Sequence, residues 1–139
     1  MASYTMFPHK HFAVVVFNNP IIELQEAIAI NDAYKNDSHY SNIHYLIIIM
    51  TGCRPNFTEK DLPRITELYT SNTQENNHKT SVWIVDEPLL TAFAHIFVNY
   101  TDEKSYYCST LNKAYILLNP KNISYMEFLD FIKQSQSNK

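Results

Sequence analysis

The sequence contains a single glycine, Gly52. The phosphate-binding loops of the Walker and dinucleotide-binding types need several glycines, because only glycine lets the backbone amides come close enough to an anion. The Gly-x-Ser-x-Gly elbow of serine hydrolases has the same requirement and is missing. The sequence therefore excludes nucleotide binding through these loops and hydrolysis through that elbow.

Clustered basic residues, long hydrophobic runs and cysteines are also scarce. The 11 lysines and arginines are scattered singly and the net charge is −3, so nucleic acid is not an expected partner. The apolar run Phe12–Phe17 is too short for a signal sequence or a membrane span, which predicts a cytoplasmic protein without membrane insertion. Two cysteines, Cys53 and Cys108, are typical of reduced thiols, and we expect them to be unpaired.

Apolar and aromatic residues are plentiful. With 139 residues, 45% hydrophobic and 14% aromatic, the chain is large enough to bury a core as one domain over residues 1–139. Its polar end, residues 134–139, is expected to fray.

Three apolar segments predict inner strands, because each is apolar on both faces: Phe12–Phe17, Tyr45–Met50 and Ser81–Val85. Tyr4–Phe7 is expected to form a hairpin with the first of them and to lie at an edge of the sheet. Ser105–Cys108 is shorter and more polar, which predicts the opposite edge.

Helical patterns separate these strands. Asn19 followed by Pro20 predicts a helix start, and Asp86 predicts the cap of a second helix. Ser124 with Glu127 forms a capping-box pattern that begins a last helix. Strands that alternate with helices predict an α/β fold with a mainly parallel sheet and helices packed on it.

This order of elements resembles the SpoIIAA-like fold shared by STAS domains and anti-sigma-factor antagonists. It is most similar to small stand-alone bacterial proteins of that fold whose function is not settled. The resemblance implies a binding or regulatory module that is not an enzyme. The tracts that carry it are 4–17, 24–27, 45–49, 57–62, 82–88 and 107–114.

The chain departs from the antagonists at their regulatory site. Those proteins carry a phosphorylatable serine in an Asp-Ser-x-Gly tract at a strand-to-helix turn. The comparable stretch, Met50–Pro55, contains Thr51 and no Asp-Ser pair. The resemblance therefore does not extend to the usual phosphorylation switch.

In open α/β sheets, ligands bind beyond the carboxyl ends of the parallel strands. Arg54 and the nearby helix N-termini would hold an anion there. The alternative is that these residues only cap helices, permit a turn or face solvent. The candidate ligand-binding residues are Asn18, Asn19, Thr51, Gly52, Cys53, Arg54 and Asp86.

Two other functions are open at this point. Cys53 lies beside Arg54 near a helix start, a setting that lowers a thiol pKa, so an enzyme using Cys53 or the Asp86–Glu87 pair is one alternative. A plain loop thiol is the favoured interpretation of Cys53, since no Cys-x-x-Cys motif accompanies it and no histidine is placed near it by spacing. A module that binds a lipid or another apolar ligand is the other alternative, and it rests only on apolar pockets in relatives of the fold.

The sequence also bears on metal binding, on cofactors and on the oligomeric state. His9 and His11 lack cysteine or carboxylate partners at ligand spacing, so neither a metal nor a cofactor is expected. The last helix is apolar over a wide arc, which favours a homodimer; the alternative is a monomer in which that helix packs between its own sheet and the preceding short helix. The residues of this arc are Tyr125, Met126, Phe128, Leu129, Phe131 and Ile132.

Overall fold

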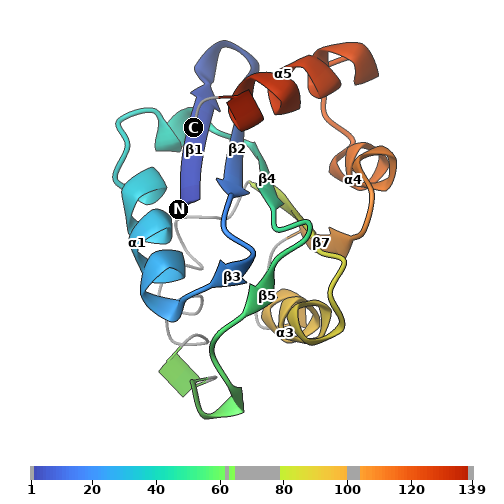
Figure 1. The fold of residues 1–139 in the computed structure, drawn as a ribbon. Coiled ribbons are helices and arrows are strands. Elements are labelled where there is room, and N and C mark those ends of the chain that lie inside the picture. The colour runs from blue at the N-terminus through green and yellow to red at the C-terminus, as the bar shows by residue number, and fades with distance from the viewer. Residues whose placement is uncertain (1, 62, 65–78, 100–103, 138–139) are drawn as a thin grey trace.

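The computed structural model describes residues 2–61, 63–64, 79–99 and 104–137. A five-stranded sheet runs through the molecule in the order β1-β2-β4-β6-β7 (Figure 1). β1 is antiparallel to β2, and all the other neighbours are parallel. The α/β prediction, the N-terminal hairpin and both edge strands are therefore confirmed. The strands are β1 Ala2–Phe7, β2 Phe12–Phe17, β4 Tyr45–Ile49, β6 Thr80–Ile84 and β7 Lys104–Cys108.

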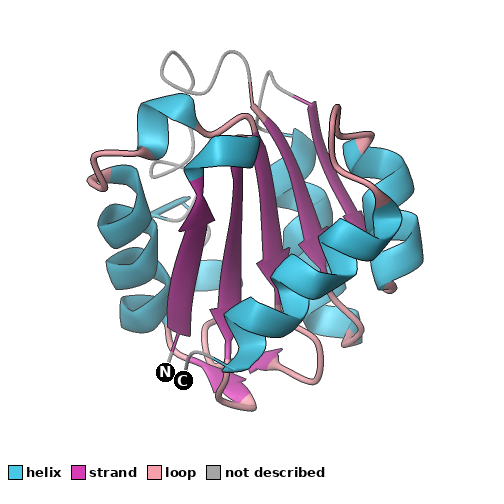
Figure 2. Ribbon diagram, turned by 90° about the horizontal axis from the view of Figure 1, so that it is seen from above, coloured by secondary structure: helices cyan, strands magenta, loops and turns pink. Residues whose placement is uncertain are grey.

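Helices cover both faces of the sheet (Figure 2). α1 (Leu24–Lys35) and α3 (Pro88–Asn99) pack on one face, while α4 (Leu111–Leu118) and α5 (Tyr125–Ser137) pack on the other. Within the described ranges, no helix has the length and apolar character needed to span a membrane.

The inner strands are buried on both faces, as their composition predicts. Every residue of β2 is buried, and successive residues alternate between the two apolar clusters that flank the sheet. Residues Leu46–Ile49 of β4 and Val82–Ile84 of β6 are buried as well, whereas Thr80 and Ser81 are half-buried. The core thus consists of two layers of side chains that this sheet separates.

The predicted helix start at Asn19 and Pro20 is wrong. Ile21–Ile22 instead form a short strand, β3, which pairs in parallel with β5 (Arg54–Pro55). The Arg54 N–H donates to the Pro20 carbonyl at 2.9 Å, and Ile22 is 1% exposed in the core. This pairing holds the chain extended, so α1 begins only at Leu24.

The last helix begins where its capping box predicts. The Ser124 N–H donates to Glu127 Oε1 at 3.3 Å, and the Glu127 N–H donates to Ser124 Oγ at 3.1 Å. Of residues 134–139, for which fraying is predicted, 134–137 belong to α5, which continues through Ser137, and 138–139 lie outside the described residues. Ser135 is buried and its hydroxyl donates to the Phe131 carbonyl at 2.8 Å, which holds this last part of the helix against the core.

Candidate functional site

A crevice of about 470 Å³ lies beyond the carboxyl ends of β4 and β6. Residues of β3, of β5 and of the start of α3 line it, and these elements lie near one another in Figure 1. Four of the seven predicted site residues meet here, namely Gly52, Cys53, Arg54 and Asp86. The complete lining is Pro20, Ile21, Gly52, Cys53, Arg54, Asp86, Glu87 and Pro88.

The other three predicted residues are not part of this lining. Asn18 and Thr51 are exposed, and Asn19 lines a different groove beside α1. Sequence reasoning missed Pro20 and Ile21, because their place in the crevice depends on the β3–β5 pairing.

Cys53 is a structural thiol. Cys53 is 3% exposed, and its Sγ–H donates to the carbonyls of Asn19 at 3.2 Å and of Phe17 at 3.5 Å. Burial raises the pKa of the Cys53 thiol, and the negative charges of Asp86 and Glu26 raise it further. The alternative of a reactive cysteine with a lowered pKa is therefore wrong. Both cysteines are free, as predicted.

Asp86 connects two turns of the crevice. Its Oδ1 accepts a hydrogen bond from the Gly52 N–H at 2.9 Å, which ties the turn after β4 to the turn after β6. Gly52 has a φ of 76°, a conformation that glycine adopts without strain.

The prediction that Asp86 caps α3 is wrong. Glu87 does so: its carboxylate accepts from the N–H groups of Leu89 at 3.1 Å and Leu90 at 2.8 Å. Glu87 directly precedes Pro88, the first residue of α3, so its side chain reaches the second and third residues of the helix, where a cap residue acts.

The crevice has charged and apolar groups at its surface, and Asp86 is exposed beside them although its Oδ1 bonds the Gly52 N–H. Arg54 is exposed and has no ion-pair partner among the described residues. Ile21 is 38% exposed in the lining, and Leu89, next to the lining residue Pro88, is 51% exposed.

His9 and His11, the two histidines considered as metal ligands, lie at the other end of the sheet and make different contacts. The rings of His11 and His44 stack with centroids 4.5 Å apart, and His11 Nδ1 lies 2.8 Å from the Asn42 carbonyl. His9 instead packs its ring edge-on against Phe131. In the part of the chain that the structure describes, no group of three or more His, Cys, Asp or Glu side chains could hold a metal ion.

Comparisons with known proteins identify no family for this chain. A scan against protein-family models finds no match, and searches of curated proteins and of solved structures find none either.

Proposed function

We propose that this chain is a protein-binding regulatory module without enzymatic activity, and that it binds its partner through the crevice beyond β4 and β6. One observation carries the proposal: the crevice groups suited to chemistry are already used to hold the fold together. Cys53, Asp86 and Glu87 each form hydrogen bonds with the backbone.

The exposed groups suit a protein partner. Ile21 and Leu89 place apolar surface beside the crevice, and Arg54 adds a cation. Exposed apolar side chains beside a polar rim are typical of interaction surfaces, and arginine is enriched at the energetic centres of interfaces. We therefore expect a partner that carries an apolar side chain next to a carboxylate or phosphate.

A relationship to the SpoIIAA-like fold is part of the proposal. It is supported by the order of the parallel strands, which follows the sequence from β2 to β7. The turn after β4, which corresponds to the regulatory stretch of the antagonists, forms one wall of the crevice and leaves Thr51 exposed. The cytoplasmic location stays a prediction.

Photo-crosslinking tests the proposal. The photoreactive amino acid p-benzoylphenylalanine is introduced at Ile21 in the cells that naturally produce the protein. The matched control carries it at Ile116, which is 59% exposed on α4, on the opposite face of the sheet. A third variant combines the probe at Ile21 with Arg54→Glu.

We expect one discrete crosslinked protein from position 21, none from position 116, and loss of the adduct in the Arg54→Glu variant. Equal crosslinking from both positions, or an adduct that Arg54→Glu leaves intact, would contradict the proposal. So would the absence of any adduct from position 21.

A further inference from the structure

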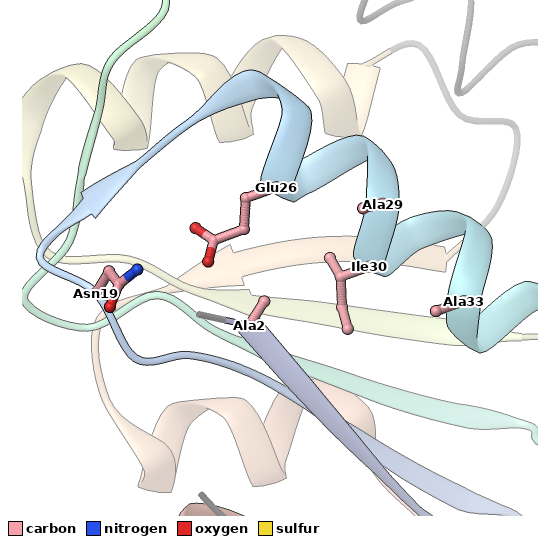
Figure 3. A pocket seen from close by; sticks show the side chains of 6 residues that line it. All are labelled: Ala2, Asn19, Glu26, Ala29, Ile30 and Ala33. Atoms are coloured by element: carbon pink, nitrogen blue, oxygen red, sulfur yellow. The ribbon is translucent and has the colours of Figure 1, made fainter.

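Two hollows lie away from the crevice, and they differ in what lines them. The groove beside α1 is lined mostly by small and apolar side chains, among them Ala29, Ile30 and Ala33 (Figure 3). A pocket of about 300 Å³ at the amino ends of β4, β6 and β7 is lined mostly by lysines, hydroxyl-bearing side chains and other polar groups. The second hollow therefore carries groups that specify the chemistry of a ligand.

The first residues of three neighbouring strands form the floor of this pocket. Tyr45 of β4 pairs in register with Thr80 of β6, which in turn pairs with Lys104 of β7. Partners across a sheet point to the same face, and successive residues of a strand alternate between faces. Tyr106, two residues after Lys104, packs with the apolar layer beneath α4 and α5. The four side chains therefore lie on the α4 side of the sheet.

The end of α4 and the turn after it form the opposite wall. α4 ends at Leu118, because Asn119 adopts a left-handed conformation with a φ of 46°. Two residues further on, the Lys121 N–H donates to the Tyr45 hydroxyl oxygen at 3.1 Å, which fixes the position of Lys121 relative to the floor. The fold thus brings two lysines from separate segments to one pocket, although the basic residues are scattered along the sequence.

The pocket combines several hydrogen-bond donors and has no carboxylate in its lining. Lys104 and Lys121 are exposed, and neither pairs with a carboxylate of the described residues. The hydroxyls of Thr80 and Tyr106 form no hydrogen bond with the part of the chain that the structure describes. The Tyr45 hydroxyl accepts from the Lys121 N–H, so its own proton is still available to donate. Two cations and three hydroxyls therefore surround a space suited to a negatively charged acceptor.

A phosphate monoester matches these groups in charge and in hydrogen bonding. It carries a charge of about −1.5 to −2 at pH 7 and three strong acceptor oxygens. Two ammonium groups balance that charge, whereas a single carboxylate would leave one of them without a counter-charge. The volume of about 300 Å³ lies at the lower end of the ~300–1,000 Å³ typical of pockets for small organic ligands. The Tyr106 ring and Leu117 add apolar surface for an organic group attached to the phosphate.

We propose that this pocket binds the phosphate group of a small phosphorylated organic molecule. Lys104 and Lys121 pair with the phosphate oxygens, Thr80 donates a hydrogen bond to them, and Tyr106 packs against the organic part. The pocket lies at the opposite end of the sheet from the crevice, so this binding is separate from the proposed interaction with a protein partner.

Titration of the isotope-labelled chain, followed by NMR at constant ionic strength, tests this assignment. The probes are phenyl phosphate, inorganic phosphate and succinate, a dicarboxylate of similar charge. Ionic strength is held constant because added salt screens charges at the surface. The pocket is changed by Lys104→Gln and by Lys121→Gln. Lys113→Gln is the matched control, since Lys113 is exposed on α4 and does not line the pocket, and Arg54→Glu removes the cation of the crevice.

We expect saturable binding of phenyl phosphate, with weaker binding of inorganic phosphate and of succinate. The amide signals that shift should be those of Thr80, Lys104, Lys121 and their neighbours. Lys104→Gln and Lys121→Gln should each weaken binding about tenfold or more, because each removes a hydrogen bond to a charged group. Lys113→Gln and Arg54→Glu should leave binding unchanged. All four variants should keep native circular dichroism, since each changed residue is exposed.

The assignment is overturned if neither phosphate binds saturably, if succinate binds as tightly as phenyl phosphate, or if Lys113→Gln weakens binding as much as the pocket variants do. Inorganic phosphate that binds as tightly as phenyl phosphate would overturn it in favour of a site for the free ion. Loss of binding in Arg54→Glu alone would place the anion in the crevice instead. Because the crosslinking experiment does not involve the pocket lysines, failure here is distinguishable from failure of the proposed function.

Discussion

Phe128 anchors α5 to the sheet, and its removal should destabilise the whole fold. The side chain is fully buried, and its ring centroid lies 5.3 Å from that of Tyr115 and 5.9 Å from that of Phe12, so it joins α4, α5 and β2. Phe128→Ala should lower the free energy of unfolding by about 3–5 kcal/mol, the usual loss when a buried phenylalanine is truncated. That loss is a large part of the ~5–15 kcal/mol by which a domain is stable.

Met126 provides the control on the same helix. Its side chain is 74% exposed, two residues from Phe128, so Met126→Ala should change the free energy of unfolding by no more than about 0.5 kcal/mol. Urea titration followed by circular dichroism measures both variants, with the slope against urea expected to stay constant. A loss below about 1 kcal/mol for Phe128→Ala, or equal losses for the two variants, would refute this placement of α5.

Four further predictions concern the thiols, a helix cap, one carboxyl group and assembly. Two free thiols should titrate in denaturant without reductant, and in the native protein Cys53 alkylation should stay slow at pH 8, since its pKa is raised. Glu87→Ala should cost about 1 kcal/mol of stability by removing the α3 cap, measured by urea titration. Hydrogen bonds from the His39 N–H and, to a lesser extent, from the Tyr4 hydroxyl hold the pKa of Asp37 below its usual value. Asp37 therefore stabilises the fold at pH values above its unfolded-state pKa, and this stabilisation is lost as the pH falls through its folded-state pKa. Tyr4→Phe should raise the Asp37 pKa measured by NMR titration, and the stabilities of the variant and the wild type should converge in acid. The homodimer that the sequence favours should give about twice the 16.3 kDa chain mass in sedimentation equilibrium, and a constant single-chain mass at rising concentration would contradict it. Phe128, Phe131 and Ile132 of the apolar arc are buried within one chain, which supports the monomer alternative.

The inner strands were predictable because their signal is local. Six consecutive apolar residues in β2 can be satisfied only by burial on both faces, and the structure buries all six. The start of α1 was not predictable in the same way. Asn19 and Pro20 have the residue types of a helix start, but the pairing of Ile21–Ile22 with Arg54–Pro55, 33 residues away, overrides that local preference.

The features of the crevice differ in the same respect. Gly52, Cys53, Arg54 and Asp86 meet because the carboxyl ends of neighbouring parallel strands share one edge of the sheet, a rule that applies before any side chain is placed. The sequence did not show which of the two acidic residues caps α3, because this depends on which side chain reaches the first N–H groups of the helix. The Glu87 carboxylate accepts from the Leu90 N–H, whereas the Asp86 carboxylate accepts from the Gly52 N–H.

The affinity of the crosslinked partner for crevice variants tests the central claim most directly. Once the partner is identified, its dissociation constant is measured by isothermal titration for the wild type, Arg54→Glu and Cys53→Ser, which keeps a hydrogen-bond donor at the buried position. We predict at least a tenfold loss of affinity for Arg54→Glu, as expected of a central interface arginine, and a change of no more than about twofold for Cys53→Ser. Full binding by Arg54→Glu together with chemical turnover of the partner that Cys53→Ser abolishes would contradict the account and identify the crevice as an active site.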